Sequence, residues 1–93
     1  MSLSNRQRQI VLQLISAEGA VTAKQLAESV AVSVRTVKYD LTDIRDWLAA
    51  KDSVLKSAPR KGIWIEASEA ARTALREKID DQLADNYLDP NER

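Results

Sequence analysis

The sequence predicts a mainly α-helical fold that carries one small β-hairpin, and three observations lead to this fold class. Three amphipathic segments repeat apolar residues with the helical period, and each follows a residue suited to cap a helix. Only residues 31–33 separate the second segment from the third, which is the tight link of a helix-turn-helix. Two short β-branched runs around Pro59 and Gly62 then predict a hairpin. The predicted architecture is therefore a winged helix-turn-helix, a three-helix bundle plus wing, with an added C-terminal helix.

The starts of the first two helices are marked by capping residues. Ser4 and Thr22 are each followed three residues later by a glutamine, the spacing of a capping box. They predict helices over residues 5–17 and Ala23–Val30. The expected apolar stripes are Ile10, Val11, Leu14, Ile15 and Ala17 in the first helix, and Leu26, Ala27 and Val30 in the second.

The third helix is expected over residues 34–50, with Ser33 as its cap. Its core stripe is Val34, Val37, Leu41, Ile44 and Leu48. Ala31, in the link before it, stands where many such motifs have glycine to permit a left-handed turn residue.

The rest of the chain predicts a wing and a last helix. Residues 54–57 and 63–65 are the expected strands, joined by a basic bend at 58–62. Ser68 then caps a helix over residues 69–86. The apolar residues of that helix recur every four positions as Ala71, Leu75, Ile79, Leu83 and Tyr87.

Composition excludes most catalytic classes. The 93 residues include no histidine and no cysteine, so serine triads, imidazole acid-base pairs and most zinc sites are excluded. The sequence contains no glycine-rich phosphate loop and no pair of carboxylates flanked by predicted strands. We therefore expect no enzyme activity, no metal or other cofactor, and no small-molecule ligand in this chain.

The sequence also lacks membrane and export signals. No apolar run reaches the roughly 20 residues that a membrane span needs. The start does not resemble a secretory signal, because Arg6 and Arg8 lead into an amphipathic segment with no small-residue cleavage site. We expect a cytoplasmic protein with no membrane partner.

The charges are divided unevenly along the chain, although their sum is zero. Residues 1–66 carry ten Lys or Arg against seven Asp or Glu, whereas residues 67–93 carry four against seven. Attraction to phosphate acts locally, over a Debye length of roughly 8–10 Å. The first two-thirds of the chain is therefore compatible with DNA binding while the acidic end lies elsewhere.

The third helix holds the residues best suited to read DNA. At roughly 100° per residue, the face opposite the core stripe holds Arg35, Thr36, Tyr39 and Thr42, flanked by Lys38 and Arg45. A helix in the major groove meets bases with its first turns, and the guanidinium fork of Arg35 matches guanine. Asp43 and Asp46 are expected on the same outward side, where phosphate repels them. Within this helix, DNA contact is thus expected only over residues 33–42.

Cations at the hairpin bend add to this surface. Such a tip commonly lies along the DNA backbone or in the minor groove, where it contributes affinity more than sequence choice. Trp47 and Trp64 are expected to be packing residues. The complete predicted DNA-binding set is Thr22, Ser33, Arg35, Thr36, Lys38, Tyr39, Thr42, Lys56, Arg60 and Lys61.

Residues 32–41, with Ile44, Trp47 and Leu48, resemble a known family. The run Arg35-Thr36-Val37 with Asp40-Leu41, and the hairpin end Lys61-Gly62-Ile63-Trp64, are similar to the N-terminal domains of bacterial operon regulators with phosphotransferase-system regulation domains, such as the mannitol- and lichenan-operon activators. The resemblance covers about residues 5–67. It implies a multidomain regulator controlled by phosphorylation of histidines in later domains.

We accordingly divide the chain into a DNA-binding domain, residues 1–67, and a C-terminal helix or linker, residues 68–93, leading to a downstream domain. The expected function is transcriptional regulation of a sugar-uptake or phosphotransferase-system operon. The partner is double-stranded operator DNA, bound by a homodimer of the full-length protein on a roughly palindromic site.

Three alternatives remain open. Repressors of the deoxyribose-regulator kind share the third helix, but their wing usually carries a His-Gly-Gly stretch that is missing here. A winged fold can also serve as a protein-docking module. The acidic final helix, with its apolar stripe of Leu75, Ile79 and Leu83, is the observation that suggests this alternative. A parent enzyme with a winged repressor domain, as in biotin ligase-repressors, is the third. RNA antitermination is least favoured, because exposed stacking aromatics on a sheet are lacking.

Overall fold

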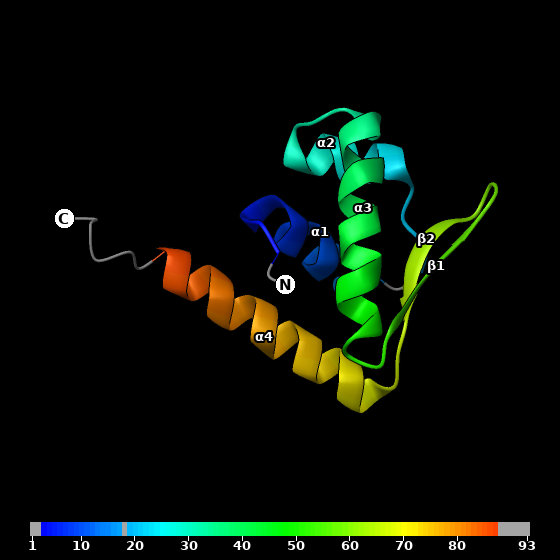
Figure 1. Ribbon diagram of the computed structural model, residues 1–93. Coiled ribbons are helices and arrows are strands. Elements are labelled where there is room, and N and C mark those ends of the chain that lie inside the picture. The colour runs from blue at the N-terminus through cyan, green and yellow to red at the C-terminus, as the bar shows by residue number, and fades with distance from the viewer. Residues whose placement is uncertain (1–2, 18, 88–93) are drawn as a thin grey trace.

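Four helices and one hairpin make up the computed structural model, which describes residues 3–17 and 19–87, with side chains through Ile79 (Figure 1). The elements are α1 (Asn5–Ser16), α2 (Ala23–Val30), α3 (Val34–Ala49), β1 (Val54–Ala58), β2 (Gly62–Glu66) and α4 (Glu69–Tyr87). Every element predicted from the sequence is present, with ends that differ by one residue at most. The fold is a winged helix-turn-helix.

The predicted caps at the starts of α1, α2 and α3 are confirmed. Both capping boxes form, because the hydroxyls of Ser4 and Thr22 accept from the main chain three residues on and a glutamine side chain accepts in return. Ser33 caps α3 through a bond from the Thr36 amide, 3.1 Å long. These local bonds set where each helix begins.

A single left-handed residue makes the turn between α2 and α3. Ala31 has φ 59° and ψ 45°, and its amide bonds to the Ala27 carbonyl. Alanine therefore adopts at this position the conformation for which glycine is usually selected. This turn reverses the chain between α2 and α3, and in Figure 1 α3 runs down the view between α1 and the hairpin.

The wing is an antiparallel hairpin joined to the rest of the domain by main-chain bonds. Leu55 pairs with Ile65, and Lys56 pairs with Trp64. Val21, just before α2, forms an isolated bridge with Ile63, in which each amide donates to the other carbonyl at 2.8 Å. The sequence did not predict this third segment of pairing, which ties the wing to the start of the helix-turn-helix.

The core lies between α1, α2, α3, the inner face of the hairpin and the first half of α4. Leu26, Ile10, Ile44, Leu48 and Val37 are fully buried. The predicted stripes account for most of this core, and Trp47, expected to pack, is only 4% exposed. The prediction that Val34 belongs to the core is wrong, because Val34 is 37% exposed at the N-terminus of α3.

The first half of α4 packs on α1. Leu75 and Ile79 of its stripe are buried, and Arg72 donates to the main-chain carbonyls of Ile15 and Ile65 at 2.5 and 3.1 Å. The expected stripe positions Leu83 and Tyr87 lie outside the described side chains. Among the described residues, no helix combines the length and the apolar character that a membrane crossing requires.

Candidate nucleic-acid interface

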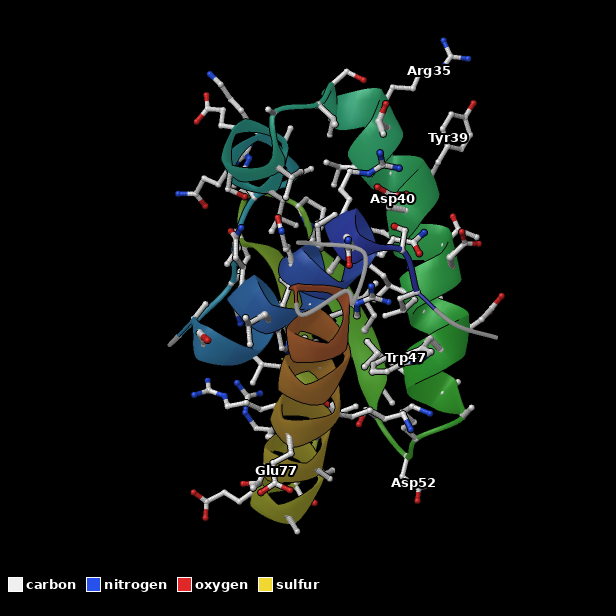
Figure 2. The ribbon with its side chains drawn as sticks, turned by 90° about the vertical axis from the view of Figure 1, so that its left-hand side faces the viewer. Arg35, Tyr39, Asp40, Trp47, Asp52 and Glu77 are labelled. Atoms are coloured by element: carbon white, nitrogen blue, oxygen red, sulfur yellow. The ribbon has the colours of Figure 1, made fainter. Side chains whose placement is uncertain are left out.

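The N-terminal half of α3 presents polar side chains to solvent. Arg35 and Tyr39 point away from the body of the domain (Figure 2), and Tyr39 is 63% exposed. Lys38 and Thr42 are also exposed, whereas Thr36 is half-buried. The structure therefore places four of the predicted DNA-binding residues of α3 on the exposed surface of this helix.

Arg35 and Tyr39 lie one turn apart and touch each other. The Tyr39 hydroxyl accepts from both Nε and Nη2 of Arg35, each at 3.4 Å, and the guanidinium carbon lies 5.8 Å from the centre of the tyrosine ring. These contacts restrict the rotamers of a long side chain, so less conformational entropy is lost when it meets a base. The pair is a partly ordered donor fork at the exposed end of the helix.

Ser33 and Thr36 form the N-terminal cap of this helix. Their hydroxyls lie 3.0 Å apart, in addition to the bond from the Thr36 amide to Ser33. Thr42 is engaged as well, since its hydroxyl donates to the Lys38 carbonyl at 3.3 Å. Exposed amides at a helix N-terminus attract phosphate, so the cap and the cations act on the same kind of ligand.

A groove runs between α3, the start of α2 and the wing. Its polar lining consists of Thr22, Lys38, Thr42, Arg45, Ser57 and Arg60. Three of these six side chains are cations, two from α3 and one from the bend of the wing, and none is a carboxylate. The groove is therefore suited to a polyanion that passes between the helix and the wing.

The three cations predicted for the wing do not all lie on the same face of the hairpin. Cross-strand partners share a face, and Lys56 is paired with Trp64 on the face opposite buried Leu55 and Ile65. Lys61 lies over the same tryptophan, with Nζ 4.5 Å from the ring centre. Of the three cations predicted for the wing, only Arg60 lines the groove.

From the sequence, Arg45 was expected only beside the exposed face of α3 and was not included in the DNA-binding set. The structure places it in the groove with Lys38. Its position one turn beyond Thr42 was the available signal. The strand residue Ser57 was not predicted, because its contribution depends on which face of the hairpin meets α3.

The carboxylates of α3 make contacts that the sequence did not predict. Asp43 is exposed, as expected, but it also accepts from Nε2 of Gln7 in α1 at 3.0 Å. Asp40 is buried and accepts from Gln7 at 3.2 Å and from two nitrogens of Arg6. Asp46 is exposed, and no described residue pairs with its side chain. Two of the three acidic groups of α3 thus hydrogen-bond to α1.

The ion pair between Arg6 and Asp40 is bidentate. Nε of Arg6 lies 2.6 Å from Oδ2 and Nη2 lies 3.0 Å from Oδ1. The hydrogen bonds to Asp40, and secondly the negative charge of Asp40, raise the pKa of Arg6 above its ordinary value. The pair with Asp40 therefore favours the charged form of Arg6.

Comparison with known proteins gives one match. The family model described as an HTH domain matches residues 6–63, which is more than half of the chain. A search of curated proteins and a search of solved structures each returned no match. The matched segment runs from Arg6 in α1 to Ile63 in β2, so it includes α2, α3 and the groove.

Proposed function

This chain belongs to the HTH domain family, a family of DNA-binding domains, and we propose that it binds a specific operator sequence in double-stranded DNA. The first turns of α3 enter the major groove, and Arg35 donates to a guanine. Ser33, Thr36, Lys38, Tyr39 and Thr42 contact neighbouring bases or phosphates.

One observation carries this proposal. The exposed half of α3 is continuous with a groove whose polar lining has three cations and no carboxylate. A major-groove helix needs phosphates of both flanking strands to be accommodated beside it. Thr22 and Arg60 line that groove together with Lys38, which supports backbone contacts there. Lys56 and Lys61, on the other face of the hairpin, add long-range attraction to the duplex.

Selection of bound sites from a random duplex pool tests the proposal. Binding of the recovered duplex and of a random duplex is then compared by fluorescence polarisation at low and high salt. We expect the recovered duplex to bind at least about a thousandfold more tightly and both affinities to fall with salt. Equal binding of both duplexes, or binding that salt does not change, contradicts the proposal.

We propose further that the full-length protein acts as a homodimer on a palindromic operator. A dimer places two copies of α3 one helical turn apart, about 10 bp between half-site centres. The selected sequences report this directly, because a dimeric site contains an inverted repeat with fixed spacing. A single unrepeated half-site contradicts dimeric binding by this chain.

The resemblance of Arg35-Thr36-Val37 and Asp40-Leu41 to phosphotransferase-system regulators supports a more specific assignment. We propose that the operator controls a sugar-uptake operon and that the regulator works in the cytoplasm. Mapping the selected site onto the source genome tests this. Sites upstream of sugar-transport genes are expected, and sites confined to unrelated genes contradict it.

The protein-docking alternative has less support. The apolar stripe of α4 suggested this function. However, Leu75 and Ile79 of the stripe are buried against the domain's own core and are not available to a partner. A docking module predicts no salt-sensitive DNA binding, so the same titration separates the two functions.

A further inference from the structure

We propose that Asp40 is a positioning residue for DNA recognition: through Arg6 and Gln7 it fixes the rotation of α3 about its own axis, and so determines where Arg35 and Tyr39 point. This inference rests on the proposed function, since it concerns how the same helix reads DNA. Figure 2 shows Asp40 directed towards α1, while Arg35 and Tyr39 project from the helix in another direction.

The geometry of the contact is directional. The two oxygens of Asp40 receive the two nitrogens of Arg6 at 2.6 and 3.0 Å, and a fork of this kind specifies orientation as well as distance. The carboxylate is almost enclosed, with 7% of its side chain exposed. Water has little access to this carboxylate, although 41% of the Arg6 side chain is exposed. Asp40 is therefore less screened than a carboxylate on the open surface.

Gln7 strengthens the link by joining three groups. Its Nε2 donates to Asp40 at 3.2 Å and to Asp43 at 3.0 Å, and its Oε1 accepts from the Ser4 amide at 2.9 Å. The start of α1 therefore holds two carboxylates that lie three residues apart on α3. Two anchor points on one helix fix its rotation better than one.

Apolar packing alone sets this rotation less sharply. The other α3 contacts with the core are made by apolar side chains, namely Val37, Leu41, Ile44, Trp47 and Leu48, and dispersion forces between them have little directional preference. Arg35 and Tyr39 are long side chains at the N-terminal end of the helix, so a small rotation moves their polar atoms by a large distance. The polar link is placed where it opposes such a rotation.

The proposal predicts an effect opposite in sign to simple electrostatics. Removing a carboxylate from a DNA-binding helix normally strengthens binding, because less negative charge faces the phosphates. If Asp40 positions α3, Asp40→Asn instead weakens binding to the selected duplex, by about tenfold. Binding to random duplex, which depends mainly on charge, should not weaken.

Asp46→Asn is the matched control. It removes the same charge from the same helix, but this carboxylate is exposed and no described residue pairs with it. It should bind both duplexes slightly more tightly. The opposite responses of two isosteric substitutions, six residues apart on α3, separate positioning from charge.

Arg6→Lys covers the case in which Asp40→Asn fails to fold. Lysine keeps the charge but lacks the planar fork. We expect a severalfold loss on the selected duplex, no change on random duplex, and an unchanged salt dependence. Circular dichroism and thermal unfolding establish that each variant is folded at the temperature of the titration.

Amide and side-chain NMR shifts of the DNA-free protein give a readout that does not require an operator. Both variants should shift the Arg35 and Tyr39 signals, whereas Asp46→Asn should leave the Arg35 signals in place. If the wild-type chain selects no duplex, the proposed function fails while this readout still tests the link. If the wild type is selective and Asp40→Asn or Arg6→Lys binds the selected duplex as well as or better than wild type, the positioning role is wrong.

Discussion

Val21 and Ile63 exchange two main-chain hydrogen bonds, each 2.8 Å long, across 42 residues of sequence. This bridge fastens β2 to the segment that precedes α2. The side of the groove formed by the wing is therefore held to the side formed by the helix-turn-helix through backbone bonds, which do not depend on side-chain identity. What the bridge does require is that the two chains approach closely.

Gly62 permits that approach, and Gly62→Ala tests it. An added methyl group would lie 2.9 Å from the Val21 carbonyl oxygen, and φ is 118°, a value that strains any other residue. We expect the free energy of unfolding to fall by about 1–3 kcal/mol, measured by urea denaturation. Gly19→Ala is the control, because a methyl group there meets no described atom within 4 Å. Equal effects of the two substitutions would show that the close approach is unimportant.

Ala31 predicts a stabilising substitution. Alanine at φ 59° carries the strain of the left-handed region, which glycine lacks. Ala31→Gly should raise the free energy of unfolding by about 0.5–1 kcal/mol in the same denaturation experiment. Ala50→Gly serves as the comparison, since Ala50 ends α3 in the right-handed region and should gain nothing. Destabilisation by Ala31→Gly would contradict this account of the turn.

The parts of the fold that sequence predicted are those encoded locally. Caps such as Ser4 and Thr22 act within three residues, and the helical period reports each buried face directly, so the helix ends and most of the core followed from the sequence. Val34 was misassigned because the period continues to the end of a helix, whereas the core does not.

The parts that sequence did not predict depend on contacts between distant segments. Arg6 and Asp40 are 34 residues apart, and neither residue alone signals a partner. The outward angle of Asp43 on α3 follows from the sequence, and Asp43 is exposed, but the position of Gln7 beside it does not follow from the sequence. Likewise, Arg60 lines the groove and Lys56 and Lys61 do not, because only one face of the hairpin meets α3.

The two faces of the wing predict unequal roles for neighbouring cations. Arg60 lines the groove, so Arg60→Gln should weaken binding to selected and random duplexes alike and reduce the slope of log affinity against log salt by about one. Lys61 lies on Trp64 at the opposite face, so Lys61→Gln should change both quantities less. Polarisation titrations at several salt concentrations measure this. An equal or larger effect of Lys61→Gln would reverse the assignment of faces.

Tyr39 is expected to act partly through Arg35. Tyr39→Phe keeps the ring but removes the hydroxyl that accepts from the guanidinium at 3.4 Å. Discrimination at the base pair read by Arg35 should fall about two- to fivefold, because the fork is less well ordered. Competition titrations with single-base-pair variants of the selected duplex report this. Unchanged discrimination there, or loss confined to another base pair, would mean that Tyr39 contacts DNA independently.

The central claim is that Arg35 reads a base from the exposed start of α3, and Arg35→Ala measured against every single-base-pair variant of the selected duplex tests it most directly. We expect the variant protein to lose about 1–3 kcal/mol of binding free energy on the selected duplex and to stop distinguishing the bases at one position, while its preferences elsewhere persist. A uniform loss at all positions and on random duplex would contradict the claim, because it would make Arg35 a contact to phosphate alone.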